Sequence, residues 1–219
     1  FTRQQAPLGL GHAVWCARDI VGDEPFAVVL PDELVLNTPG CLKQMIEHAG
    51  KLDAKSNLLA VEAVPEHLTH QYGICGVGKR QGKIFEVDGM VEKPPKGTAP
   101  SNLSITGRYI LQPEIFKILQ TQERGAGGEI QLTDGMRKLM DVQAFHGVEF
   151  KGRVYDCGDK IGYLRATAAL AMANVAFSAD ADANGSGRSG PTAASASAAS
   201  NASCSPLPAQ PLSTGVTAT

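Results

Sequence analysis

The stretch Phe26-Ala27-Val28-Val29-Leu30-Pro31-Asp32 predicts both a fold class and the position of a site. A short, wholly apolar run is typical of a strand that is buried on both faces of a sheet. Asp32 follows the end of this strand, and in open α/β sheets ligands bind outside the carboxyl ends of strands. A second aspartate, Asp156, closes another strand-like run, although an aspartate after Leu-Pro can also simply cap the next turn. Two carboxylates that meet at such an edge could hold Mg²⁺, which prefers oxygen ligands.

Helical and strand-like patterns alternate on both sides of this stretch. Apolar residues recur at helical spacing over residues 10–20 and 42–49, and Asn57 to Val64 is a second buried-strand pattern. This alternation favours a parallel sheet covered by helices. We therefore predict an α/β fold with a Rossmann-like, mostly parallel mixed sheet and flanking helices.

The later part of the chain has a more mixed pattern. Residues 72–79 and 83–87 are predicted short strands around a Gln81-Gly82 turn. The other elements that we expect are strands over 105–111, 144–150 and 153–155, and helices from Pro113, over 129–142 and over 161–177.

The composition changes sharply near Ser178. From there to Thr219 the chain has no aromatic residue, and Ala, Ser, Gly, Pro and Thr dominate. Such a segment buries too little apolar surface to offset the entropy cost of ordering. We predict a folded domain over residues 1–177 and a disordered tail over 178–219; the tail could be a linker or the product of a shifted reading frame.

Composition also narrows the class of partner. The 219 residues carry a formal net charge of −2 and are 43% hydrophobic, which gives no electrostatic argument for nucleic acid or an anionic membrane. No run is long enough for a transmembrane helix, and no signal peptide is visible. The five cysteines have no CxxC pairing, so they indicate reduced thiols in a cytoplasmic protein and argue against zinc.

An acid and a base stand side by side in Val91-Glu92-Lys93-Pro94. Because a proline restricts the residue before it to extended conformations, we expect Glu92 and Lys93 to present their side chains to different parts of one ligand. A plain surface ion pair would explain the same residues. His12 in turn can be a packing residue beside the first helix, and Asp159 a cap of the final helix.

Several phrases together resemble the bacterial UTP–glucose-1-phosphate uridylyltransferases, which are sugar-nucleotide pyrophosphorylases of nucleotide-diphospho-sugar transferase fold. The resemblance extends in order over residues 1 to about 177, which would form a partial nucleotidyltransferase domain. The phrases that carry it are Gln4 to Ala13, Pro25 to Asp32, Tyr72-Gly73-Ile74, Val91 to Pro94, Gly107 to Leu111, Gly128 to Asp134 and Asp156 to Lys160.

The resemblance implies a reaction in which the oxygen of glucose 1-phosphate attacks the α-phosphorus of UTP. Pyrophosphate leaves and UDP-glucose forms, and the protein mainly positions two anions while Mg²⁺ neutralises charge. By resemblance, Asp32 and Asp156 would hold Mg²⁺, with Asp32 and Lys93 in the catalytic set.

The substrate contacts follow from the same resemblance. Gln4 and Gly9 would contact the uracil, and Gly73, Glu92 and Tyr109 would line the glucose pocket. Lys93 would bind the sugar phosphate as a point charge.

Two departures from the family pattern qualify these expectations. Glu33 stands where relatives usually have a second aspartate, and this longer carboxylate could still face solvent, so we attach little weight to the departure. The Gly-rich basic loop that wraps the triphosphate in relatives is not found in this sequence, so we expect the chain to show little UDP-glucose synthesis and poor stability. A homo-oligomer is the expectation for full-length members.

Two alternatives stay open at this point. The chain could be a non-catalytic fragment with a partial sugar-phosphate site. It could also be a related pyrophosphorylase with another base or sugar, which would depend on residues near Gln4, Gly9 and Tyr109.

Overall fold

A computed structural model describes residues 2–184. The chain divides into two compact units between Ala176 and Phe177, and all strands of the described residues belong to the first unit. Its strands are β1 (Phe26–Val29), β2 (Glu33–Leu36), β3 (Asn57–Ala63), β4 (Gly73–Cys75), β5 (Arg80–Gln81), β6 (Ile84–Glu86), β7 (Met90–Glu92), β8 (Leu103–Leu111), β9 (Phe145–Glu149) and β10 (Arg153–Asp156).

Helices and short helical turns connect these strands. The α-helices are α1 (Leu10–Trp15), α2 (Arg18–Val21), α3 (Cys41–Ala49), α4 (Ile115–Thr121), α5 (Leu132–Leu139) and α6 (Lys160–Asn184), and the 3₁₀ turns are η1 (Glu66–Gln71) and η2 (Ala126–Gly128). The apolar pattern over residues 10–20 thus forms two short helices, and the helix predicted over 129–142 is shorter at both ends.

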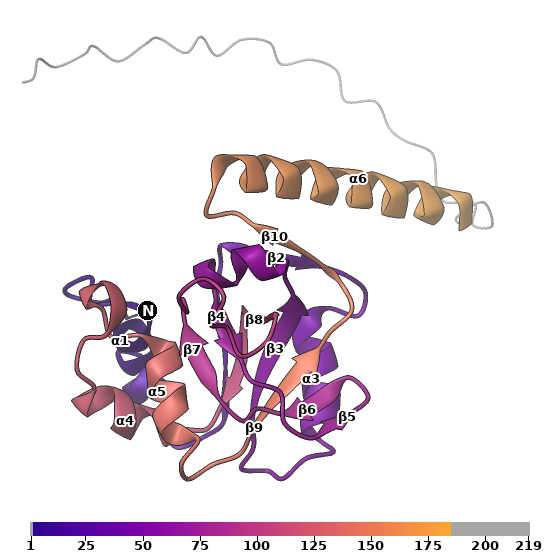
Figure 1. Ribbon diagram of the computed structural model, residues 1–219. Helices are drawn as coiled ribbons and strands as arrows, with labels where there is room; N and C mark the ends of the chain where they lie inside the picture. Colours follow the sequence, from indigo (N-terminus) through magenta and orange to yellow (C-terminus); the bar gives the residue numbers. More distant parts are fainter. Residues whose placement is uncertain (1, 185–219) are drawn as a thin grey trace, which may run out of the picture. The chain divides into compact units, whose positions relative to one another are not determined.

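The central sheet has the strand order β5-β6-β9-β3-β8-β4-β7, and β1 pairs with β8 beside this path. Strand β8 is long: its first part pairs with β4 at Ser104, and its last part pairs with β1 over Arg108–Leu111. Strands β2 and β10 form a separate antiparallel ribbon. Figure 1 shows α1, α4 and α5 on one side of the sheet and α3 on the other.

The α/β class with a mixed sheet and flanking helices is confirmed, but the expectation of a mostly parallel sheet is wrong. Among the ladders of the described residues, only β3 with β9 runs parallel. The other pairs are antiparallel. The long strand β8 runs antiparallel to β1, β3 and β4, and β5 and β6 form a hairpin. The periodicity of a strand shows that it is buried but not which neighbour it pairs with.

Strand β3 is buried along Asn57–Val61 because each of its faces meets a hydrophobic cluster. Leu59 and Val61 belong to the larger cluster, with residues of α4, α5 and β8. Leu58 and Ala60 pack with Cys41 and Met45 of α3. The alternation of side chains along a strand places these two sets on opposite faces.

Strand β1 differs from the expectation of a strand buried on both faces. Its residues alternate between half-buried and exposed, and Val29 is 49% exposed. A continuous apolar run therefore predicted the strand correctly but not the covering of its second face.

The final helix crosses the boundary between the two units and runs to Asn184, past the predicted end of the domain at residue 177. Its start is capped as predicted, because Asp159 Oδ1 accepts hydrogen bonds from the Ile161 and Gly162 amides at 2.7 and 2.9 Å. The rest of the predicted tail, 185–219, lies outside the described residues, and its disorder stays a prediction. Within residues 2–184 no helix combines the length and apolar character that a membrane crossing requires.

Candidate functional site

Two adjoining cavities lie where the turn after β1 meets the middle of β8. The helix-side cavity, of about 180 Å³, is lined by residues of the sheet and of the segments around α1 and α5: Leu10, Leu30, Glu33, Gln71, Tyr72, Gly73, Glu92, Ile105, Tyr109, Gln131, Leu132 and Thr133. The ribbon-side cavity, of about 190 Å³, is lined by Glu33, Glu62, Tyr72, Ser104, Ile105, Thr106, Val154 and Asp156. Glu33, Tyr72 and Ile105 line both cavities, so we treat the two adjoining cavities as one candidate site.

The helix-side cavity brings together three of the residues that we expected in a sugar pocket: Gly73, Glu92 and Tyr109. Strands β4 and β7 place Gly73 directly opposite Glu92. A Cβ on Gly73 would lie 3.0 Å from Glu92 Oε2 and 3.4 Å from Thr133 Oγ1. The glycine therefore leaves room for the Glu92 carboxylate at the cavity wall.

The Glu92 carboxylate is held in place by the protein. Thr133 Oγ1, in the first turn of α5, donates a hydrogen bond to Glu92 Oε2 at 2.8 Å. Tyr109 is 6% exposed, and burial followed by the charges of Glu33, Glu92 and Asp32 raises the pKa of its phenol, which therefore stays protonated at neutral pH. Sequence reasoning missed Thr133 as a site residue, although it stands in the Gly128 to Asp134 phrase.

Lys93 is exposed and lies beside the helix-side cavity rather than in its lining. Its φ is +46°, so the expectation of an extended backbone before Pro94 is wrong. The Lys93 amide donates to the Tyr72 carbonyl at 3.0 Å, and this bond keeps the chain against β4. A non-glycine residue with positive φ is uncommon and concentrates at functional sites, because the surrounding structure must stabilise it.

The ribbon of β2 and β10 brings the chain segments that carry the two aspartates side by side. Glu33 stands opposite Asp156 in this ribbon, and the Cys157 amide donates to the Asp32 carbonyl at 2.6 Å. Both aspartates are exposed. Asp156 Oδ1 also accepts a hydrogen bond from the Gly158 amide at 2.8 Å, which orients its carboxylate. The fold therefore brings the backbone of Asp32 beside that of Cys157, and the shared cation site of Asp32 and Asp156 stays a prediction.

The donor set suits a hard divalent cation that takes its remaining oxygen ligands from water or from a substrate. Within residues 2–184, no group of three or more His, Cys, Asp or Glu side chains could hold a metal ion. Two exposed carboxylates supply oxygen donors that match the preference of Mg²⁺, which commonly completes its shell with substrate phosphates and water.

Glu33 is half-buried between the two cavities rather than facing solvent, as its longer side chain could have done. Its Oε2 accepts a hydrogen bond from the Gly107 amide at 2.7 Å. Burial raises the pKa of the Glu33 carboxyl, and the charges of Asp32 and Asp156 add to this effect, while the Gly107 amide and Arg108 oppose it. The sequence did contain a signal for a role of Glu33 in the site, because this residue directly follows Asp32.

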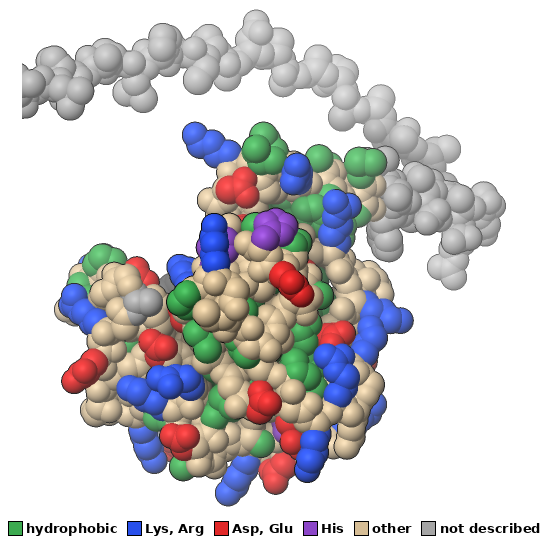
Figure 2. Space-filling model, in the orientation of Figure 1, with side chains coloured by type: hydrophobic (Ala, Val, Ile, Leu, Met, Phe, Trp, Pro, Cys, Tyr) green, Lys and Arg blue, Asp and Glu red, His purple; other side chains and the backbone are tan. Residues whose placement is uncertain are grey.

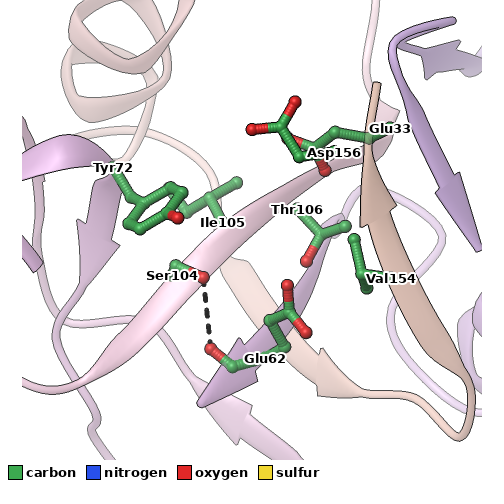
Figure 3. Close-up of a pocket in the computed structure, with 8 residues that line it drawn as sticks. All are labelled: Glu33, Glu62, Tyr72, Ser104, Ile105, Thr106, Val154 and Asp156. Carbon is green, nitrogen blue, oxygen red and sulfur yellow. Dashed lines mark hydrogen bonds between the residues drawn. The ribbon is translucent and has the colours of Figure 1, made fainter. Parts of the chain in front are cut away.

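The ribbon-side cavity gathers acidic and hydroxyl groups. Figure 3 shows Glu33 and Asp156 beside each other, with the Thr106 hydroxyl pointing toward Glu62. Ser104 Oγ donates to the Glu62 carbonyl at 3.3 Å, and Thr106 Oγ1 is buried without a hydrogen-bond partner among the described residues. Burial and the Glu33 charge raise the pKa of the Glu62 carboxyl.

The segment expected to contact a base lies against the loop before α5. Leu8 and Gly11 form backbone hydrogen bonds with Ile130 at 2.7 and 2.8 Å. Gly9 has φ +102°, and a Cβ there would lie 2.7 Å from Glu129 Cβ, which explains a glycine at this position. Gln4 Nε2 lies 3.0 Å from the Gly9 carbonyl and 2.9 Å from His12 Nδ1. Gln4 and Gly9 are thus together, and Leu10 brings their segment to the helix-side cavity.

The plainer interpretation of His12 holds as well. Its ring stacks on Trp15 with centroids 5.8 Å apart, so it is a packing and hydrogen-bonding residue of α1. Cys16, Cys41, Cys75 and Cys157 are free thiols, in agreement with reduced cysteines; Cys204 lies outside the described residues.

Known proteins have similar sequences over most of this chain. The family model described as "Nucleotidyl transferase" matches residues 1–172. A UTP–glucose-1-phosphate uridylyltransferase of Bacillus subtilis is 50% identical over 173 residues, which are 78% of this chain and 58% of the relative. One of Komagataeibacter xylinus is 48% identical over 153 residues, which are 70% of this chain and 53% of the relative.

Solved structures are similar in fold. A UDP-glucose pyrophosphorylase complexed with UDP-glucose matches with a TM-score of 0.73 at 38% identity, over 78% of this chain and 64% of that one. A UTP-bound enzyme of this kind from Acinetobacter baumannii matches with a TM-score of 0.67 at 42% identity, over 77% of this chain and 58% of that one. The chain thus spans only part of the length of these relatives.

Proposed function

Because the chain belongs to the nucleotidyl transferase family, we propose that it carries the sugar-phosphate and metal side of a UTP–glucose-1-phosphate uridylyltransferase. The proposed reaction forms UDP-glucose and pyrophosphate from UTP and glucose 1-phosphate. The observation that carries the proposal is the junction of the two cavities. Gly73, Glu92 and Tyr109 line one of them, Asp156 lines the other, and Glu33 lines both. A sugar in the first cavity would have its phosphate near the aspartate pair.

In this proposal the helix-side cavity binds glucose. The Glu92 carboxylate accepts hydrogen bonds from sugar hydroxyls, and Thr133 holds it in the orientation to do so. Tyr109, whose raised pKa keeps it a neutral phenol, offers a donor rather than a charge. Gly73 leaves space for the ring close to β4.

Lys93 would bind the phosphate of glucose 1-phosphate as a point charge. Its exposed side chain and its left-handed backbone, anchored on the Tyr72 carbonyl, support this role. Holding the phosphate oxygen in line with the α-phosphorus of UTP lowers the barrier mainly through orientation, because phosphoryl-group transfer needs little covalent help from the protein.

Asp32 and Asp156 would hold Mg²⁺ together with phosphate oxygens of the nucleotide. When bound there, Mg²⁺ supplies positive charge that stabilises the charge developing on the transferred group. The chain's own contribution is to keep both aspartates exposed and to tie the Asp32 carbonyl to the Cys157 amide, directly after Asp156. Gln4 and Gly9 would contact the uracil edge from the segment before α1.

The location and assembly of the protein are part of the same proposal. Free thiols fit a cytoplasmic protein. On the face drawn in Figure 2, basic and acidic side chains are interspersed, so this face offers no broad basic patch for nucleic acid among the described residues. A homo-oligomer is proposed for the full-length protein.

A test of Lys93 distinguishes a substrate role from a surface ion pair. In a full-length relative that carries this segment, we expect Lys93→Ala to raise the KM for glucose 1-phosphate at least tenfold, about 1.4 kcal/mol. The melting temperature should move little because the side chain is exposed. Steady-state kinetics of pyrophosphate release with UTP, glucose 1-phosphate and Mg²⁺ measure this effect.

Lys96→Ala is the matched control, because Lys96 is an exposed lysine of the same loop. The control should leave the KM unchanged. Wild-type kinetics in Lys93→Ala would refute the role of Lys93, and faster turnover with another sugar phosphate or nucleotide would favour a related pyrophosphorylase.

A further inference from the structure

The turn that carries Asp32 is attached to β8 at the point where β8 changes its neighbour. Strand β8 pairs with β4 at Ser104 and with β1 from Arg108 onward, so Gly107 lies between the two pairings. The Leu30 amide donates to the Gly107 carbonyl at 2.9 Å, and the Gly107 amide donates to Glu33 Oε2 at 2.7 Å. Both ends of the turn are thus fixed to one residue of β8.

Arg108 holds the same turn with its side chain. Its Nη1 donates to the Leu30 carbonyl at 2.9 Å and to the Gly107 carbonyl at 2.7 Å, and its Nη2 donates to the Glu33 carbonyl. Leu30 and Glu33 flank Pro31 and Asp32. One planar guanidinium therefore sets the spacing of the two carbonyls on either side of Asp32. Lysine lacks this fixed fork of donors.

Holding a loop with a buried guanidinium costs desolvation free energy. Arg108 is 8% exposed, and its side chain donates to the three backbone carbonyls of Leu30, Gly107 and Glu33. Removing a charge from water carries a large desolvation cost, and apolar residues of similar size often serve stability equally well or better. The fork geometry, rather than stability alone, is what arginine adds at this position.

One hydrogen bond connects the turn to the segment that carries the second aspartate. The Cys157 amide donates to the Asp32 carbonyl at 2.6 Å, directly after Asp156. The chain of contacts runs from Arg108 to the turn, from the turn to Asp32, and from Asp32 to the end of β10. A shift of the turn would change the position of one carboxylate relative to the other.

We propose that Arg108 is a positioning residue that sets Asp32 relative to Asp156, so that both carboxylates reach one divalent cation. The inference rests on the proposed function, since it takes these two aspartates as the metal ligands. Arg108 contacts neither the metal nor the substrate in this role.

The test uses Mn²⁺ alone as a paramagnetic probe on the ¹⁵N-labelled chain. In the wild type, Mn²⁺ should broaden the amide signals of residues 32–33 and 156–158. In Arg108→Met, broadening near Asp32 should fall at least threefold relative to that near Asp156. Arg108→Lys should give an intermediate ratio. Arg137→Met, an exposed arginine of α5, is the matched control and should behave as the wild type.

Hydrogen exchange separates positioning from a general loss of stability. In Arg108→Met the Cys157 amide should exchange at least tenfold faster, while the amides of the β2–β10 ladder keep their rates. An equal rise throughout the ladder would overturn the positioning role in favour of a structural one. If Arg108→Met does not fold, the same ratios in Arg108→Lys decide the question.

Two other results of the Mn²⁺ experiment would each contradict a different part of the proposal. Equal broadening near both aspartates in the variants and the wild type would overturn the role of Arg108 and leave the metal assignment intact. An absence of broadening near either aspartate in the wild type would overturn the metal assignment and the inference with it.

Discussion

The carboxylates of the two adjoining cavities have different surroundings. In the helix-side cavity, Glu92 is held by the Thr133 hydroxyl at 2.8 Å and faces a glycine. In the ribbon-side cavity, burial raises the pKa of both Glu33 and Glu62. Repulsion from Asp32 and Asp156 adds to the rise at Glu33, and repulsion from Glu33 adds to the rise at Glu62. A carboxylate that the protein already orients suits recognition of neutral hydroxyls, whereas crowded carboxylates are stabilised by an arriving cation. Under the proposed function, this difference would assign sugar binding to the helix-side cavity and charge compensation to the ribbon-side cavity.

The largest effect is expected when the helix-side cavity is filled. Gly73→Val adds a side chain whose Cβ would lie 3.0 Å from Glu92 Oε2 and 3.4 Å from Thr133 Oγ1. We expect binding of glucose 1-phosphate to weaken at least tenfold, about 1.4 kcal/mol or more. Titration followed by amide chemical shifts measures it, and Mn²⁺ broadening near Asp156 should stay the same.

Gly89→Val is the matched control, because a Cβ at Gly89 meets nothing within 4 Å. The division between the cavities would be wrong if Gly73→Val changed the Mn²⁺ broadening as strongly as it changed sugar-phosphate binding.

A smaller effect is expected from the hydroxyl that orients Glu92. Thr133→Val keeps the shape of the side chain but removes the donor to Glu92 Oε2. We expect weaker binding of glucose 1-phosphate by about 1 kcal/mol, a typical net value for one hydrogen bond. Calorimetry with glucose 1-phosphate measures the loss.

Thr69→Val controls for a buried threonine hydroxyl away from this cavity. Thr69 Oγ1 donates to the Glu66 carbonyl at 2.8 Å, so the variant should lose comparable stability without losing affinity. Equal affinity in Thr133→Val and the wild type would show that Glu92 needs no such support.

The smallest effect concerns the pH dependence of stability. The raised pKa of Glu62 means that the folded state binds its proton more tightly than the unfolded state. Stability therefore falls as the pH rises from the unfolded pKa, about 4.3, through the folded pKa. We expect Glu62→Gln to be more stable than the wild type at pH 7, by less than about 1 kcal/mol, with the difference vanishing below about pH 4.

Urea midpoints at the two pH values measure this difference. Glu66→Gln, at an exposed glutamate of η1, should show none of it. A less stable Glu62→Gln at pH 7 would show that the carboxylate is stabilised in the fold and that the two cavities are more alike than we infer.

The local patterns of the chain were sufficient for most elements and for the place of the site. Alternating periodicities predicted β3, α3, β6 and the helix after Asp159. The strand expected over 72–79 is only the short β4, and Gln81, expected in the turn, instead ends β5. Asp156, Glu92 and Gly73 were marked by the sequence and line the two neighbouring cavities, whereas Asp32 lines neither of them. These features follow from the sequence because burial period, turn residues and caps act over a few positions.

The pairing of strands and the chemistry of Glu33, Thr133 and Arg108 depend on contacts between distant segments. The sheet is mainly antiparallel because β8 pairs with β3, β4 and β1, a choice that no local pattern encodes. Glu33 is half-buried, with its carboxylate against the Gly107 amide of β8. The left-handed backbone at Lys93 is held by the carbonyl of Tyr72, next to β4. The periodicity of a sequence predicts which side chains are buried. The partners and charge states of those side chains depend on residues that are distant in sequence and become neighbours only in the folded protein.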